Sequence, residues 1–207
     1  ITTILIEDIE NKRFSIVNFY ERRARRILPA LFFVMLVCIP FAWMWMLPDP
    51  LENFGQSIVA TTLSANNVLL YLTSGYWDLA SEFKPFLHTW SLGVEEQFYL
   101  IFPLFLYLSW KLGVIRTLQL LLITAILSVL LCLWTAMIDT NANYYSSITR
   151  AWELLSGAIT AFIVKQHGTR ANNLFASIGL SLIFGSLFFN DNGVQYPSIY
   201  TFIRKIQ

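Results

Sequence analysis

The sequence predicts an all-α fold, a multi-pass transmembrane helical domain with about five to six membrane segments. Three observations lead to this class. Of the 207 residues, 56% are hydrophobic and only 13% are charged, which is too apolar for an ordinary soluble domain. Several stretches with few or no charges reach the roughly 20 residues that a helix needs to cross a membrane. Most basic residues gather in short clusters between those stretches, as in the cytoplasmic loops of membrane proteins.

The candidate membrane segments follow one another along most of the chain. They are Ile27–Leu47, Ser57–Trp77, Leu92–Trp110, Thr117–Ile138, Tyr144–Val164 and Leu174–Phe189. The first and the fourth are the clearest, because both are long and carry no charge. In the first, Pro29 is expected in the opening turn of the helix and Pro40 is expected to kink its middle. No internal repeat interrupts the series, so residues 1–207 are interpreted as one membrane domain.

The segment Ser57–Trp77 leaves the topology open. It is apolar but contains Asn66 and Asn67, so it either spans the membrane or enters and leaves on one side. Irregular segments persist at membrane depth only where protein or water surrounds their backbone. The basic residues before Ile27 are expected in the cytoplasm. The later basic residues then favour the re-entrant alternative, which places His88 outside, but the membrane face of His88 stays open.

Two cysteines, Cys38 and Cys132, each lie inside an apolar run. We interpret them as small apolar side chains and not as a disulfide. The chain contains no Cys and His spacing typical of a zinc site, and no metal is expected.

The segment "YERRARR", residues 20–26, places four arginines at the expected start of the first clear helix. They are Arg22, Arg23, Arg25 and Arg26. One interpretation is that they set the membrane topology and contact anionic lipids. The other is a binding site for a phosphorylated donor, because the planar guanidinium donates paired hydrogen bonds to phosphate. Cations at a helix N-terminus oppose the helix dipole, which mildly favours a reason beyond folding.

The stretch "FLHTWSLGVEEQFYL", residues 86–100, combines a histidine with two adjacent carboxylates. Ser91 is expected as the N-cap, which places Glu95 and Glu96 near the first turn, where the helix dipole favours negative charge. One carboxylate would serve that purpose, and each costs free energy at membrane depth. His88, near the two acids, is therefore a candidate for proton transfer, with Tyr99 one turn further along.

Arg150 and Glu153 stand three residues apart within a predicted membrane segment. At that spacing on a helix the two side chains can pair. Ionisable residues inside a membrane are functional candidates by default, and the structural alternative is a self-neutralising pair that orients the helix.

Three motifs, in this order and at this spacing, resemble the acyltransferase-3 family of bacterial inner-membrane proteins. They are "FYERRARRILPAL", "LHTWSLGVEEQFYLIFPL" and "TRAWELLSGAITAF". Members of that family transfer acyl groups, mostly acetyl groups, to hydroxyls of surface glycans such as lipopolysaccharide O-antigen and peptidoglycan. The resemblance implies a multi-pass acyltransferase of the bacterial inner membrane, with acyl-CoA (acetyl-CoA) as donor substrate and no permanently bound cofactor.

The resemblance also implies a role for each motif. The arginines of the first motif are implied to engage acyl-CoA from the cytoplasm. The second motif is implied to line the transfer site through His88, Trp90, Glu95, Glu96, Gln97 and Tyr99. The third motif contributes Arg150, Trp152 and Glu153. The predicted catalytic group is His88, Glu95, Glu96 and Tyr99, and the other residues of the second and third motifs are predicted to bind substrate or support the site.

The family pattern also includes parts that lie beyond these motifs. Its first membrane helix carries a histidine regarded as the catalytic base, and several helices follow "QYPS". Some members add a C-terminal periplasmic esterase-like domain. We therefore expect this chain to be the interior of an acyltransferase, inactive by itself. The expected partners are acyl-CoA, a surface or lipid-linked glycan acceptor and membrane lipid, with no nucleic acid.

A rival interpretation from another class is a multi-pass transporter subunit with an intramembrane charged site. Intramembrane charges and a re-entrant segment would suit a transporter. The sequence shows no internal repeat, which argues against that class.

Overall fold

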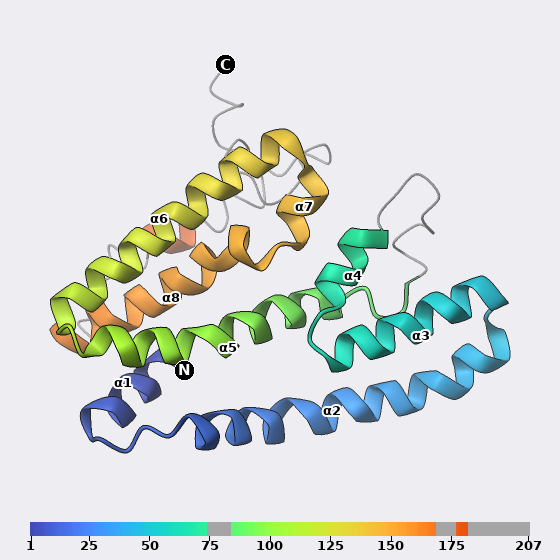
Figure 1. Ribbon diagram of the computed structural model, residues 1–207, viewed down its shortest axis with the longest axis horizontal. Coiled ribbons are helices and arrows are strands. Elements are labelled where there is room, and N and C mark those ends of the chain that lie inside the picture. The colour runs from blue at the N-terminus through green and yellow to red at the C-terminus, as the bar shows by residue number, and fades with distance from the viewer. Residues whose placement is uncertain (74–83, 169–176, 182–207) are drawn as a thin grey trace.

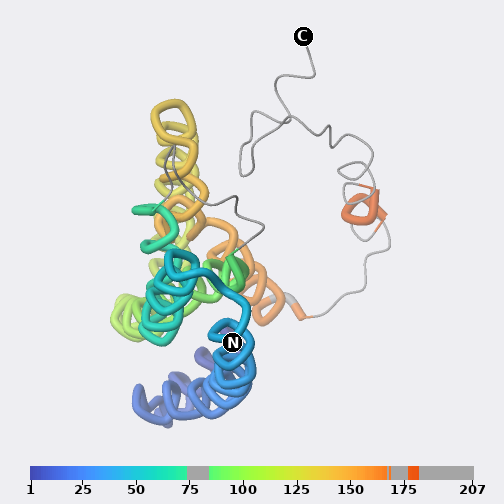
Figure 2. Tube along the Cα trace, turned by 90° about the vertical axis from the view of Figure 1, so that its right-hand side faces the viewer, coloured from blue at the N-terminus to red at the C-terminus, as the bar shows by residue number. Residues whose placement is uncertain are grey.

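The computed structural model describes residues 1–73, 84–168 and 177–181, and every element in this part of the chain is a helix. The predicted all-α class is confirmed. The helices are α1 (Thr2–Glu10), α2 (Ile16–Trp45), α3 (Pro48–Thr62), α4 (Asn66–Thr73), α5 (Thr89–Trp110), α6 (Val114–Ile138), α7 (Thr140–Tyr145) and α8 (Ser147–His167). Figures 1 and 2 show α2 along one edge of the bundle and α6 along the opposite edge, with α5 and α8 between them.

Helix α2 joins the basic cluster and the first predicted membrane segment into one element. It begins after Ser15, whose hydroxyl accepts a hydrogen bond from the Asn18 N–H at 3.4 Å, as an N-cap does. Pro29 therefore lies in the middle of the helix and not in its first turn, so that prediction is wrong. Helix α2 ends at Trp45, and α3 begins at Pro48 after a short link. Proline is favoured in the first turn of a helix, so Pro48 helps α3 to start there.

The ambiguous segment Ser57–Trp77 is not one continuous helix in its described part. The chain leaves α3 at Thr62 and starts α4 at Asn66, and between them Ser64 has a φ of 55°, which a helix does not tolerate. Protein surrounds this break: the Gln97 amide donates a hydrogen bond to the Ser64 carbonyl at 2.9 Å. Trp77 lies outside the described residues.

A close approach of α5 to this break depends on Gly93. A Cβ at position 93 would lie 2.9 Å from Asn67 Oδ1 and 3.2 Å from the backbone oxygen of Ser64. Both distances are shorter than ordinary van der Waals contacts. Any larger residue would therefore push α5 away from the α3–α4 turn.

The largest apolar core joins α1, α5, α6 and α8, with Phe19 of α2 at its edge. Its buried members include Leu5 on α1, Phe102 and Leu106 on α5, Leu121 on α6 and Phe162 on α8. Helices α6 and α8 make the most extensive contact in the bundle. The predicted segment Tyr144–Val164 is interrupted at Ser146, which caps α8 by accepting a hydrogen bond from the Ile148 N–H.

Two of the described helices, α2 and α6, are long and apolar enough to cross a membrane. That is fewer than the five to six segments expected from the sequence. Helix α5 includes Glu95 and Glu96, and α8 includes Arg150, Glu153 and Lys165, which lower their mean hydropathy. Most of Leu174–Phe189 lies outside the described residues. Cys38 and Cys132 are not joined in a disulfide, in agreement with their interpretation from the sequence.

Candidate functional site

The first two sequence motifs meet at Arg23 of α2, which contacts two residues of α5. The guanidinium donates a hydrogen bond from Nε to Glu96 Oε1 at 2.9 Å, and its Nη2 lies 2.8 Å from the same oxygen in an ion pair. Its central carbon lies 3.4 Å from the centroid of the Tyr99 ring. The side chains of Arg23 and Glu96 are only 13% and 22% exposed, so the pair is shielded from water on most sides. We call Arg23, Glu96 and Tyr99 the arginine clamp.

The clamp is the strongest polar link between α2 and α5 among the described residues. A hydrogen bond to a charged group stabilises by about 1.5–3 kcal/mol, and a partly desolvated cation–π contact adds about 1–2 kcal/mol. One turn earlier on α2, the Tyr20 hydroxyl donates to the Leu100 carbonyl at 2.6 Å. These contacts fix the rotation of α2 about its axis relative to α5.

The other three arginines of the cluster are engaged differently. Arg22 pairs with Asp8 at 3.0 Å and Arg25 pairs with Glu21 at 2.7 Å, and both arginines are largely exposed. Arg26 is exposed too. All four arginines lie beyond the first turn of α2. The helix dipole acts mainly within the first turn, so the predicted dipole penalty does not apply to them.

His88 and the two glutamates are not brought together. Helix α5 starts at Thr89 after His88, and Ser91 is not its N-cap, since the Ser91 hydroxyl donates back to the His88 carbonyl at 3.1 Å. Glu95 and Glu96 therefore lie beyond the first turn, about 10 Å along the axis from His88, and the predicted dipole explanation fails. Within the described residues, neither the His88 imidazole nor the exposed Glu95 carboxylate has a hydrogen bond or ion pair.

Arg150 of the third motif contacts the second motif through Trp90. Its guanidinium carbon lies 4.7 Å from the Trp90 ring centroid and 5.5 Å from that of Tyr144, and these two rings are 4.6 Å apart. The predicted pairing with Glu153 is confirmed at 3.4 Å. Within the described residues, Arg150 Nε and Trp152 Nε1 are buried without a hydrogen-bond partner.

Gln97 anchors a partly buried network of neutral polar groups. Its amide nitrogen donates to Asn67 Oδ1 at 2.9 Å, and its Oε1 accepts a hydrogen bond from the Ser147 hydroxyl. Asn67 Nδ2 donates to the Tyr145 carbonyl at 3.0 Å. We call Asn67, Gln97 and Ser147 the amide network. Asn67 and Ser147 are not among the predicted site residues, although two adjacent asparagines inside an apolar segment were a signal for Asn67.

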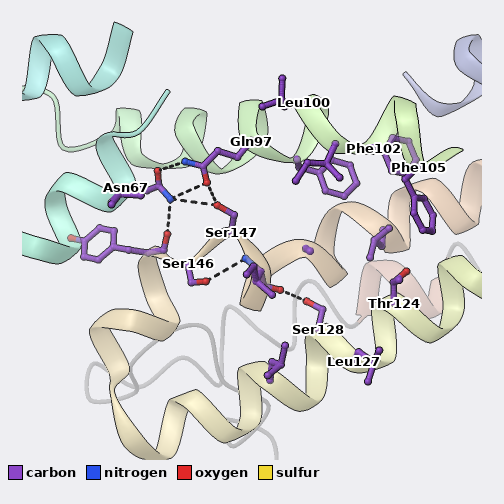
Figure 3. Close-up of a pocket in the computed structure, with 18 of the residues that line it drawn as sticks. Asn67, Gln97, Leu100, Phe102, Phe105, Thr124, Leu127, Ser128, Ser146 and Ser147 are labelled. Carbon is purple, nitrogen blue, oxygen red and sulfur yellow. Dashed lines mark hydrogen bonds between the residues drawn. The ribbon is translucent and has the colours of Figure 1, made fainter. Parts of the chain in front are cut away.

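A cavity of about 800 Å³ lies between α4, α5, α6, α7 and α8, next to the amide network. Figure 3 shows Asn67, Gln97 and Ser147 at one end of it, with Phe105 and Thr124 toward the other. Twelve of its twenty described lining residues are Leu, Ile, Phe, Val or Ala. No residue of α2 contributes to the lining, so the arginine cluster and the cavity are separate features.

A family model described as an acyltransferase domain matches residues 9–204, which is most of the chain. The chain belongs to the acyltransferase-3 family. An uncharacterized protein of Haemophilus influenzae is 33% identical, with 95% of this chain and 85% of that protein aligned. Peptidoglycan O-acetyltransferase OatA of Listeria monocytogenes is 34% identical, and O-acetyltransferase OatA of Staphylococcus aureus is 30% identical.

The aligned region covers 79% of this chain in each of the two OatA comparisons, but only 27% and 28% of those proteins. No solved structure matches the chain. The family match identifies an acyltransferase domain, and proteins of this acyltransferase-3 family are membrane proteins. The apolar helices α2 and α6 are consistent with that setting.

Proposed function

We propose that the protein transfers an acetyl group from acetyl-CoA to a hydroxyl of a cell-wall glycan. The contact between the first and second motifs in the arginine clamp carries this proposal, because it places the phosphate-suited arginines beside the helix of the predicted catalytic group. The named relatives are O-acetyltransferases, one of them of peptidoglycan, which favours a peptidoglycan acceptor. Lipopolysaccharide O-antigen is the alternative acceptor of the same chemical kind.

The proposed setting is the bacterial inner membrane, crossed several times by the full-length protein. Helices α2 and α6 supply two of the proposed crossings. Helices α5 and α8 are the next candidates, at 22 and 21 residues, since a crossing needs about 20 residues. Three of their charged residues would be tolerated at membrane depth because Glu96 pairs with Arg23 and Arg150 pairs with Glu153. Lys165 pairs with Glu10, and Glu95 lies in the second turn of α5.

The donor phosphates are proposed to bind the exposed arginines Arg22, Arg25 and Arg26. Phosphate recognition needs a guanidinium that can offer its planar fork, and exposed surface pairs such as Arg25–Glu21 are weak enough to exchange partners. Arg23 differs, because its fork is already occupied by Glu96. We therefore assign Arg23 a positioning role between the donor-binding helix and α5.

The transfer reaction needs a base that takes the proton of the acceptor hydroxyl and donors that stabilise the thioester oxyanion. His88 and Glu95 have free functional groups in the described part of the chain, so they are proposed to contact substrate. Glu96 and Tyr99 are proposed to act through Arg23. Trp90, Arg150, Trp152 and Glu153 are proposed to support α5 from the side of α8.

The proposal is tested by acetyl transfer from labelled acetyl-CoA to cell-wall glycan, using membranes that contain the full-length protein. The variants are Arg23→Ala, His88→Ala and Glu95→Gln, with Lys12→Ala as an exposed control outside the cluster. We expect activity to fall at least about tenfold in each variant at unchanged membrane level, equivalent to about 1.4 kcal/mol of transition-state stabilisation. Wild-type activity in all three variants would show that the assigned site is wrong.

A further inference from the structure

We propose that the cavity bounded by α4, α5, α6, α7 and α8 binds a hydrocarbon chain of a membrane lipid. At about 800 Å³ it is within the range of ligand sites, roughly 300–1,000 Å³. It is also too large to be a packing defect, since voids larger than a water molecule are rare in protein interiors. Its shape is set by four helices and the short α7, which Figure 3 shows surrounding it.

The chemistry of the lining excludes a charged ligand. Twenty described residues line the cavity, and none of them is Asp, Glu, Lys, Arg or His. An ionised group placed there would lose its hydration without gaining a counter-charge, at a cost of several kcal/mol. Phosphates of a nucleotide-like donor are therefore not expected inside it.

Most polar side chains of the lining already have hydrogen-bond partners within the protein. Within the amide network, Gln97 and Asn67 exchange hydrogen bonds and Ser147 joins both. Ser128 of α6 is inserted into the backbone of α8, donating to the Ile148 carbonyl at 2.5 Å and accepting from the Trp152 N–H at 3.1 Å. A polar ligand would find few open partners here, whereas an apolar chain would lose nothing by entering.

The open side of the cavity faces outward between exposed apolar side chains. Leu100 and Ile101 of α5, Leu127 of α6 and Ile148 of α8 all line the cavity and are more than half exposed. Helix α6 is one of the two described helices suited to crossing a membrane. With α6 in the proposed membrane setting, the open side of the cavity would face the lipid bilayer.

The occupant is therefore a chain of a bilayer lipid and not the acyl group of the donor. An acetyl group is far smaller than the cavity, and no arginine of the cluster lies in the lining. This inference depends on a membrane setting but not on the acyl-transfer proposal. Its test does not measure activity, so either proposal can fail alone.

The test uses the full-length protein in phosphatidylcholine vesicles that contain a lipid with a photoactivatable diazirine near the end of one acyl chain. After irradiation, labelled peptides are mapped by mass spectrometry. We expect labels on the cavity residues of α5, α6 and α8. Leu127→Trp should block the opening and abolish labelling deeper in the cavity, at Phe105 and Leu155.

Ile126→Trp is the matched control, because Ile126 is the neighbour of Leu127 on α6 and equally exposed, at 57% against 53%, but does not line the cavity. Ala151→Leu fills the cavity from α8 and serves as a second variant should Leu127→Trp fail to accumulate. Equal loss of labelling in the variants and the control, or no cavity label in the full-length protein, would overturn the inference. So would loss of the label on adding long-chain acyl-CoA, which would assign the cavity to a donor.

Discussion

Two adjacent residues of α5, Glu96 and Gln97, belong to two regions of opposite character. Glu96 points to α2 and pairs with a cation, while Gln97 points to α4 and α8 and binds only neutral groups. Successive residues of a helix are turned by about 100°, which is what separates the two environments. The arginine clamp depends on charge, whereas the amide network is neutral and is built around Asn67, which is 2% exposed.

The two regions join different helices to α5: the clamp joins α2, and the amide network joins α4 and α8. The clamp holds α2 against α5 through an ion pair that is mostly shielded from water, so it depends on both side chains being charged. A closed network of amides and hydroxyls has no better partner available, so it fixes α4, α5 and α8 permanently. We infer that α5 is held to α2 by charge on its Glu96 side and to α4 and α8 by neutral hydrogen bonds on its Gln97 side.

The largest effect is expected from opening the amide network. Asn67→Leu removes the donor to the Tyr145 carbonyl and leaves the Gln97 amide with one partner fewer. Each buried group left unsatisfied costs about 1–3 kcal/mol, so a loss of about 3 kcal/mol in the free energy of unfolding is expected. Thermal or denaturant unfolding of the purified full-length protein measures it. Val68→Ala, next to Asn67 and partly exposed, should cost less than a third of that.

The clamp is expected to come second, and a double-mutant cycle isolates it. Arg23→Ala, Glu96→Ala and the double variant should give a coupling of about 1–2 kcal/mol in the free energy of unfolding, because the pair is mostly shielded from water. The pair Arg25–Glu21 on the same helix is exposed and should couple by only about 0.3–0.5 kcal/mol. Equal coupling in both pairs would remove the distinction between the clamp and an ordinary surface pair.

A smaller effect is expected at Gly93 of α5, which lies close to Asn67 of the amide network. In Gly93→Ala the new methyl would meet Asn67 Oδ1 at 2.9 Å and the Ser64 carbonyl at 3.2 Å. Overpacking typically costs about 1–3 kcal/mol, but alanine is favoured over glycine in a helix by about 1 kcal/mol. The expected net loss is about 1 kcal/mol, read from the same unfolding curves. Gly157→Ala on α8, which has open space around it, should be neutral or stabilising.

The sequence predicted the helices well but the site only in part. Apolar runs located α2, α5, α6 and α8, because a helix that crosses or borders lipid needs a long stretch of mostly apolar residues. The start of α5 was misplaced because Ser91 has the residue type of a cap but not the backbone position of one. The amide network joins residues 30 and 50 positions apart, and no local pattern specifies such a pairing.

The Arg23–Glu96 contact was predicted only in the sense that both residues belong to family motifs. Motif membership says that residues matter but not which of them touch. Arg22 and Arg23 are adjacent in the sequence, yet one binds Asp8 of α1 and the other Glu96 of α5, since they lie on different sides of α2. The three-dimensional path of α1 and α5 decides that outcome, and that path depends on long-range packing.

The smallest effect is expected at Asp139, outside the membrane-spanning helices, where α4 meets the start of α7. The Ala142 N–H donates to this carboxylate at 3.0 Å, and the Tyr71 hydroxyl also donates to it at 3.0 Å. The hydrogen bond from Ala142, and then that from Tyr71, holds the pKa of Asp139 below its usual value. A lowered pKa stabilises the folded state above the unfolded-state pKa, near 3.9, and this contribution is lost as the pH falls through the folded-state pKa.

Wild type should therefore unfold at a slightly higher temperature than Asp139→Asn at pH 6, and the gap should close as the pH falls below about 4. Asparagine can still accept the Ala142 N–H, so the variant keeps the cap and loses only the charge. Because this link is exposed, its effect should lie well below that of Asn67→Leu, although both residues tie α4 to the α7 region. A larger effect at Asp139 than at Asn67 would mean that charge, and not the buried neutral network, holds α4 in place.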